Sequence, residues 1–174
     1  MKKITFIFLI AAITLAGCAT VQSIIKSTFP YTSSLIVPAS NKINSTNSTS
    51  SKATSFDQIF GNQNSTDYIK EVRITSAKIM ATNPNSQNLG VFKSVKIYIS
   101  NGSSGEVMVA SRKDISEQIG SDLILDIDNS RFLDNYIKGS NLRVRMEYVL
   151  RNSLTKDVSV KAALNFSTSP NTNN

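Results

Sequence analysis

The chain has 174 residues, with 19 Lys and Arg against 12 Asp and Glu, and 40% of its residues are hydrophobic. This length allows one compact domain with appendages, and the composition is too apolar for a wholly disordered protein. Histidine is absent and there is one cysteine, which excludes Ser-His-Asp and Cys-His catalytic groups, His-ligated metal sites and an intramolecular disulfide. No metal and no cofactor are predicted.

Residues 1–17 are predicted to form a signal peptide. Lys2 and Lys3 make a cationic start, and residues 4–16 carry no charge. A helix of this length would rise only about 20 Å, whereas the hydrocarbon core of a bilayer is about 30 Å thick. The run therefore fits the apolar region of a secretory signal better than a membrane span. A buried N-terminal helix is the alternative.

The end of this run, Leu15-Ala16-Gly17-Cys18, resembles the lipobox of bacterial lipoproteins. The resemblance covers residues 1–18. It implies cleavage before Cys18 and a thioether link from its sulfur to a diacylglycerol. Two acyl chains are enough for stable anchoring, so the resemblance predicts a membrane-bound protein without a spanning helix.

The residues after the cysteine, Ala19 and Thr20, bear on location within a bacterial envelope. In well-studied lipoproteins of this kind, aspartate at that place marks retention in the inner membrane. The resemblance therefore implies an outer-membrane lipoprotein that faces the periplasm.

Residues 18–54 are predicted to be a lipid anchor followed by a disordered tether. In residues 38–54, Ser, Thr and Asn make up eleven of seventeen positions, and Ile43 is the only large apolar side chain. Such a segment buries too little surface to offset the entropy of ordering its backbone. Residues 35–37 are apolar and are compatible with either a short strand or an exposed patch.

Residues 55–168 alternate between apolar and polar side chains, which predicts half-buried antiparallel strands over 91–99, 142–150 and 158–166, with shorter ones at 106–111 and 123–128. In the run 68–82 the alternation changes parity, which predicts a bulge near Thr75 and Ser76. Asn101 and Gly102 predict a hairpin turn. Residues 169–174 are predicted to be a disordered tail.

The pattern around 131–138 is helical, with Asp128, Asn129 or Ser130 as candidate caps and Gly139 as the end. Six to eight strands with no long helix predict an all-β fold, an immunoglobulin-like antiparallel β-sandwich with one short helix. A small β-barrel is the alternative. The antibody-type cysteine pair and tryptophan are missing, so the likeness concerns architecture alone.

Four basic residues form the candidate ligand site. Arg143, Arg145 and Arg151 lie on one predicted strand and Lys161 on the next, so pairing of these strands would create a cationic stripe for an anionic glycan or an acidic envelope protein. An ordinary solvated sheet face is the alternative. The acidic residues between 122 and 134 predict a solvated face or a helix cap, with a weak cation site as the alternative.

These observations favour a non-catalytic, membrane-anchored envelope lipoprotein that presents a β-sandwich as a binding or interaction module. It resembles the small sandwich lipoproteins of bacterial envelopes. The alternatives are a structural subunit that docks on another envelope protein, and a hydrolase that uses carboxylates. No nucleic-acid partner is predicted, because the charge is spread along the chain and no reading motif is present.

Overall fold

The computed structural model describes residues 28–56, 67, 69–139 and 141–171. The predicted signal peptide and Cys18 lie outside the described residues. Eight strands form the domain. They are β1 (Phe29–Val37), β2 (Thr46–Ser50), β3 (Ile69–Asn83), β4 (Phe92–Ser100), β5 (Glu106–Arg112), β6 (Asp122–Ile127), β7 (Arg143–Leu150) and β8 (Val158–Pro170).

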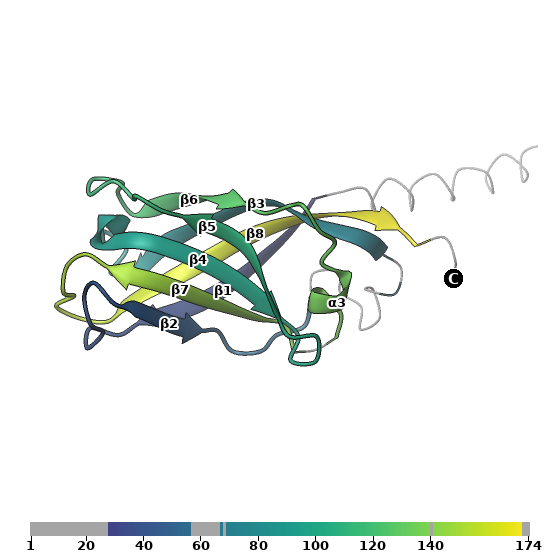
Figure 1. The fold of residues 1–174 in the computed structure, drawn as a ribbon, viewed down its shortest axis with the longest axis horizontal. Helices are drawn as coiled ribbons and strands as arrows, with labels where there is room; N and C mark the ends of the chain where they lie inside the picture. Colours follow the sequence, from purple (N-terminus) through teal and green to yellow (C-terminus); the bar gives the residue numbers. More distant parts are fainter. Residues whose placement is uncertain (1–27, 57–66, 68, 140, 172–174) are drawn as a thin grey trace, which may run out of the picture.

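The strands make two antiparallel sheets that face each other across one core (Figure 1). One sheet has the order β1-β8-β3-β6, and the other has the order β2-β7-β4-β5. A short pairing of β5 with β6, at Ala110 with Ile127 and Ser111 with Asp126, joins them along one side. This strand order is that of a double-sheet jelly roll. The predicted all-β antiparallel sandwich is confirmed, and its topology is a jelly roll.

The core is built from the alternating positions that the sequence marked as apolar. On β7 every second residue, from Val144 to Leu150, is buried, and on β8 the same holds from Val158 to Thr168. Two aromatic contacts lie in this core. Phe56 meets Phe166 of β8 edge to face at 5.5 Å, and within the other sheet Phe92 of β4 meets Tyr148 of the neighbouring β7 in the same way at 5.4 Å. The residues that alternate with these buried side chains on β7 and β8 lie on the outer faces of the sheets.

Three local predictions are confirmed. The register of β3 against β8 shifts between Ile74 and Ser76, at the predicted bulge. The Asn101-Gly102 turn joins β4 to β5, with Gly102 at φ +85°. The predicted short helix is one turn, α3 (Asp134–Ile137). It begins after Leu133 without a side-chain cap, so the prediction of Asp128, Asn129 or Ser130 as the cap is wrong.

The predicted boundary between tether and domain is wrong. Residues 29–37 form β1, which pairs with β8 over its whole length, and residues 46–50 form β2, which pairs with β7. The domain therefore begins near residue 29. At the other end β8 continues to Pro170, past the predicted boundary at 168, and residues 172–174 of the predicted tail lie outside the described residues.

The error has a physical reason. Composition predicts whether a segment can fold by itself, whereas the edge strand β2, which has no apolar side chain, is held by backbone pairing with β7. The hydroxyls of β2 and its flanks add to that pairing: the Ser51 Oγ accepts a hydrogen bond from the Val144 amide at 3.0 Å. Asn47 donates to the carbonyls of Lys42 and Ser45, both at 2.9 Å, which orders the approach to the strand.

The two ends of the sandwich differ in what they carry (Figure 1). One end holds the start of β1, the end of β8, the β4–β5 hairpin and α3. The other end holds the connections β1–β2, β3–β4, β5–β6 and β7–β8. The β3–β4 connection includes the single-turn helix η3 (Leu89–Val91), whose Gly90 lies so close to the Glu117 backbone that a Cβ would stand 2.1 Å from its carbonyl oxygen.

Removal of β1 and β2 is expected to unfold the domain. A chain that begins at residue 55, the boundary suggested by composition, lacks the buried side chains Phe29, Tyr31, Leu35 and Val37. Each contributes roughly 1.5–3 kcal/mol by burial, and the total approaches the whole stability of a typical domain, about 5–15 kcal/mol. A chain that begins at residue 28 should show a cooperative thermal transition by circular dichroism, and the shorter chain should show none. Equal transitions in both would contradict this domain boundary.

Candidate functional site

The four basic residues of the predicted stripe do not come together. Arg143 and Arg145 lie on β7 and Arg151 follows it, in the sheet β2-β7-β4-β5. Lys161 lies on β8, in the other sheet. Because β7 and β8 pair with other strands and face each other across the core, their outward side chains point in opposite directions. The premise of the stripe, that these two strands pair, is wrong.

Arg145 is held in a network of side chains on the outer face of its sheet. Its Nε and Nη2 donate to the two carboxylate oxygens of Glu106 at 2.7 and 2.6 Å, and its Nη1 donates to Glu147 at 3.4 Å. The guanidinium also stacks on Tyr98, 4.1 Å from the ring centre. Lys96 completes the network with a 2.8 Å bond to Glu147.

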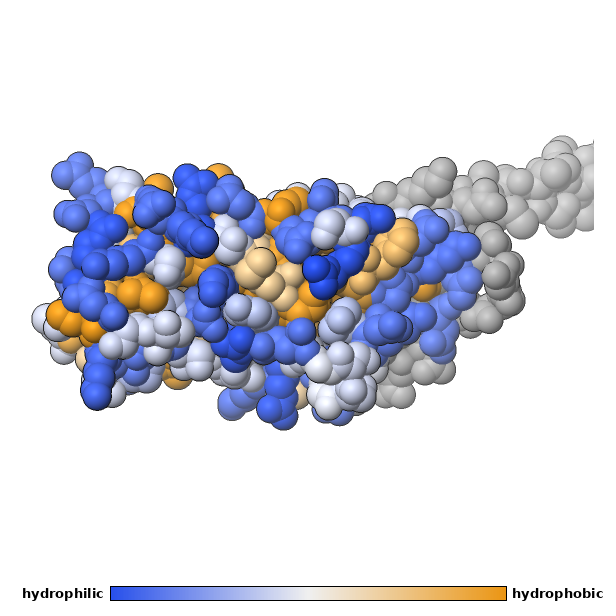
Figure 2. All heavy atoms as spheres, in the orientation of Figure 1, coloured by the Kyte–Doolittle hydropathy of each residue, from blue (hydrophilic) through white to orange (hydrophobic). Residues whose placement is uncertain are grey.

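The charges of this network stabilise one another. The hydrogen bonds to Glu106 raise the pKa of Arg145, and the bond from Lys96, together with Arg145, lowers the pKa of Glu147. The same bond to Glu147 raises the pKa of Lys96. Every donor group of Arg145 therefore has a carboxylate partner within the protein, and the network is suited to tying β4, β5 and β7 together. Figure 2 shows this face, which is hydrophilic over most of its area.

The other basic residues have separate surroundings. Arg151 donates to the Ile115 carbonyl at 2.7 Å and pairs with Glu117 at 3.0 Å, so it fastens the β5–β6 connection to the end of β7. Lys161 lies on the outer face of the opposite sheet, between Ser34 of β1 and Met80 of β3. Arg143 is exposed at the start of β7.

The acidic residues between 122 and 134 do not converge either. Each carboxylate has its own partner: Asp122 pairs with Lys78, Asp126 with Arg112, Asp128 with Ser130 and Arg131, and Asp134 with the Val72 amide. In the part of the chain that the structure describes, no three acidic side chains lie together as metal ligands would. Within the described residues, moreover, no helix is long and apolar enough to cross a bilayer.

A groove lies where β1 and β2 run beside each other without pairing. These strands are the two edges of the eight-stranded order, and the open groove between them, named here the seam groove, has a volume of about 570 Å³. Its lining consists mostly of hydroxyl residues: Thr32, Ser33, Ser34, Ile36, Thr49, Ser50, Ser51, Lys52 and Thr54.

One end of the seam groove is closed by side chains. The hydroxyls of Tyr31 on β1 and Thr54 beyond β2 share a hydrogen bond. Thr54 is itself held by backbone bonds of 2.9 and 2.8 Å to Leu142, the residue just before β7. Burial raises the pKa of Tyr31, against the opposing effect of its hydrogen bonds with Thr54 and Ser33. The phenol therefore stays neutral at physiological pH and serves as a fixed clasp.

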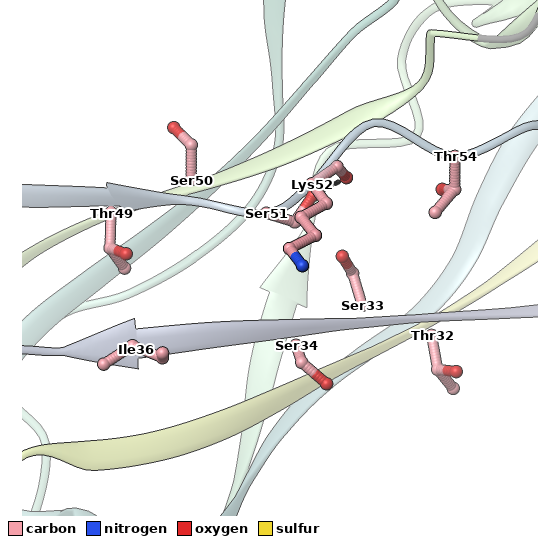
Figure 3. A pocket seen from close by; sticks show the side chains of 9 residues that line it. All are labelled: Thr32, Ser33, Ser34, Ile36, Thr49, Ser50, Ser51, Lys52 and Thr54. Atoms are coloured by element: carbon pink, nitrogen blue, oxygen red, sulfur yellow. Dashed lines mark hydrogen bonds between the residues drawn. The ribbon is translucent and has the colours of Figure 1, made fainter.

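The side chains of the seam groove fall into two groups (Figure 3). Ser33, Thr49 and Lys52 point into the gap between the strands, whereas Thr32, Ser34 and Ser50 point away from it, so the latter line the groove with their backbones. Lys52 is exposed and is the only charged residue in this lining. The groove thus combines two strand edges, several hydroxyls and one cation, without a carboxylate among its lining residues.

The seam groove was not predicted, although its signals are present in the sequence. Residues 29–37 alternate, with Phe29, Tyr31, Leu35 and Val37 on one face, and this is the pattern of a half-buried strand. Proline in such a strand marks an edge, and Pro30 stands at its start. The facing strand β2 has no apolar side chain, so the alternation pattern does not predict it. Without β2, a groove beside β1 could not be predicted either.

Comparisons with known proteins add little to this picture. No family model and no curated protein matches the chain. Among solved structures, it is similar to that of desmodium yellow mottle tymovirus, with 9% identity, a TM-score of 0.30, and coverage of 85% of this chain and 89% of the other. For a decameric BFDV capsid protein the identity is 10% and the TM-score is 0.36, with coverage of 82% of this chain and 98% of the other. For CBM32-3 from a family 31 glycoside hydrolase of Clostridium perfringens the identity is 11% and the TM-score is 0.33, with coverage of 83% of this chain and 76% of the other. At such scores the similarities say nothing about function.

The Arg145 network predicts a specific dependence of stability on pH. Because the pKa of Glu147 is lower in the folded protein than its ordinary value of 4.5, its stabilising contribution is complete above about pH 4.5 and is lost as the pH falls through the folded-state value. Glu147→Gln should therefore be less stable than the unaltered protein at about pH 6, and the difference should shrink at about pH 3. Urea unfolding at both pH values measures it.

Asp128 also contributes to the pH dependence of stability, but it does not affect this comparison. Hydrogen bonds from Ser130 lower its pKa, so its stabilising contribution is also lost as the pH falls. Because Asp128 is present in both proteins, this contribution cancels in the difference between them. A difference between the two proteins that stays constant with pH would show that the charge of Glu147 does not stabilise the network.

Proposed function

We propose that this protein is a non-catalytic lipoprotein of a bacterial envelope, anchored through lipid on Cys18, and that its sandwich is a binding module. The observation that carries the proposal is the position of the chain's single cysteine at the end of Leu15-Ala16-Gly17-Cys18, behind a charged start and an uncharged run. That residue order is what the lipid-transfer chemistry of such proteins needs. Ala19 and Thr20 support a place in the outer membrane on the periplasmic side.

The direction of β1 supports a definite orientation on that membrane. The first residue of β1, Phe29, pairs with Phe166 near the end of β8, at the end of the sandwich that carries α3 (Figure 1). From Cys18 to Thr28 is ten residues, a contour of at most about 36 Å. The α3 end is therefore the membrane-proximal one under this proposal, and the four connections at the opposite end point away from the bilayer.

The seam groove supports binding over catalysis. Its hydroxyls and Lys52 are suited to hydrogen bonding, and its lining residues include no carboxylate and no thiol. The exposed large hydrophobic residues Ile36, Ile43, Ile119, Ile124 and Phe132 belong to five different segments. Such a distribution supports a grooved binding module over a subunit that docks by one large apolar face.

Lipid attachment is tested by metabolic labelling. Radioactive palmitate is expected to enter the unaltered protein, because the Cys18 thiol is the proposed acceptor, and not Cys18→Ser. The membrane fraction should contain the former, while the latter accumulates as the uncleaved precursor or in the soluble fraction. Ala19→Ser, a neighbouring change that keeps the thiol, is the control and should label normally. Equal labelling of Cys18→Ser would overturn the anchor.

Binding at the seam groove is tested by photo-crosslinking in intact cells. A benzophenone amino acid at position 52 or 49 projects into the groove, whereas one at position 124 projects from the outer face of β6, where Ile124 is 74% exposed. Light should produce an adduct with an envelope component at positions 52 and 49 and not at 124. Adducts at all three positions, or at 124 alone, would show that the ligand does not bind specifically at the seam groove.

A further inference from the structure

The seam groove is bordered by two strand edges whose backbone groups have no strand partner. β1 pairs with β8 on one side only, and β2 pairs with β7 on one side only. In a strand, successive residues direct their N–H and C=O groups to opposite sides, so half of the backbone groups of each edge face the groove. These groups are a template for a further strand.

The residues that face the groove can be identified on both edges. On the β2 side, the Ser51 amide donates to Val144 at 2.8 Å, so by alternation the backbone groups of Ser48 and Ser50 face away from β7 and toward the groove. On β1, Pro30 has no N–H, and a proline in an edge strand turns its nitrogen away from its neighbour. By the same alternation Thr32, Ser34 and Ile36 present their backbone groups to the groove, and all three are among its lining residues.

We propose that the seam groove binds an extended, acidic peptide segment, which adds as a strand to the free edge of β1. This inference rests on the proposed function and names its ligand. β1 has nine residues against five in β2, and Pro30 blocks only its first part, so Thr32 to Ile36 remain available. The donors and acceptors of alternate residues recur about every 6.7 Å, which is the repeat of a peptide backbone.

Charge and side-chain chemistry specify the peptide further. Lys52 points into the groove, and none of the other lining residues carries a charge, so an Asp or Glu of the bound segment finds a cation and meets no carboxylate in the lining. The Thr49 hydroxyl of β2 also points into the groove and can bond to the edge of the added strand that faces β2. The lining contains no aromatic ring of the kind on which sugar rings stack, which favours a peptide over a glycan.

The test uses the full chain in detergent micelles and a phage library of random dodecapeptides. Peptides enriched on the unaltered protein are expected to be acidic and poor in proline. Their affinity is then measured for two matched pairs, Ser34→Pro with Ser34→Ala, and Lys52→Glu with Lys52→Arg. Ser34→Pro removes an N–H that faces the groove, whereas Ser34→Ala keeps it, and the two Lys52 variants differ in charge.

Binding should fall at least about tenfold in Ser34→Pro and in Lys52→Glu, as expected for a lost hydrogen bond or a reversed charge, and by no more than about twofold in Ser34→Ala and Lys52→Arg. Circular dichroism establishes that Ser34→Pro is folded. If it is not, the Lys52 pair and peptides with N-methylated backbones decide, because N-methylation also removes strand hydrogen bonds and should abolish binding.

Other results would overturn the inference in distinguishable ways. Enriched peptides that tolerate N-methylation would exclude strand addition. Binding of a uronic-acid oligosaccharide that depends on Lys52, without peptide binding, would identify a glycan module, so the peptide inference fails while the proposed function stands. A dimer in sedimentation that dissociates in Ser34→Pro would make a second copy of this chain the occupant. No binding of either probe would remove both the peptide and the groove as a binding site.

Discussion

The backbone of a β-sheet must be paired, and this requirement shapes the molecule more than any single side-chain contact. Eight strands in one antiparallel order leave two edges, β1 and β2, and the fold brings these edges side by side instead of placing them at opposite ends of a flat sheet. Side chains close the seam at one end, through Tyr31 and Thr54, and leave the rest open. The same geometry therefore completes the sandwich and creates its groove.

The two faces of the sandwich are organised differently around that seam. On the outer face of the sheet with β7, charged residues satisfy one another across three strands, with Arg145 at the centre. On the seam, hydroxyls and a single lysine line a gap between strand edges. A charge that is already hydrogen-bonded to two carboxylates must lose those bonds to receive a ligand, whereas an unpaired strand edge gains bonds when it is covered. This difference is why the seam groove, and not the Arg145 network, is the better candidate binding site.

The position of the groove also suits an anchored protein. The seam runs along the side of the sandwich, between the end that carries α3 and the end that carries the four connections (Figure 1). Under the proposed anchoring, a ligand can approach the groove parallel to the membrane surface, while the four connections at the other end point away from the bilayer. Ten residues lie between Cys18 and Phe29, the first residue of β1, so these ten residues limit how far the groove stands from the proposed anchor.

Much of the local structure follows from the sequence alone. Alternation of apolar and polar residues gives the buried face of β4, β7 and β8, the parity change at Thr75 and Ser76 gives the bulge, and Asn101-Gly102 gives the hairpin, because each depends on neighbours in the chain. Alternation does not reveal which strands lie side by side, since every strand has two equivalent edges. Only the tertiary structure separated Arg145 from Lys161 onto opposite faces and made a strand of the polar residues 46–50, because long-range backbone pairing with β7 supplies the stability that their own composition lacks.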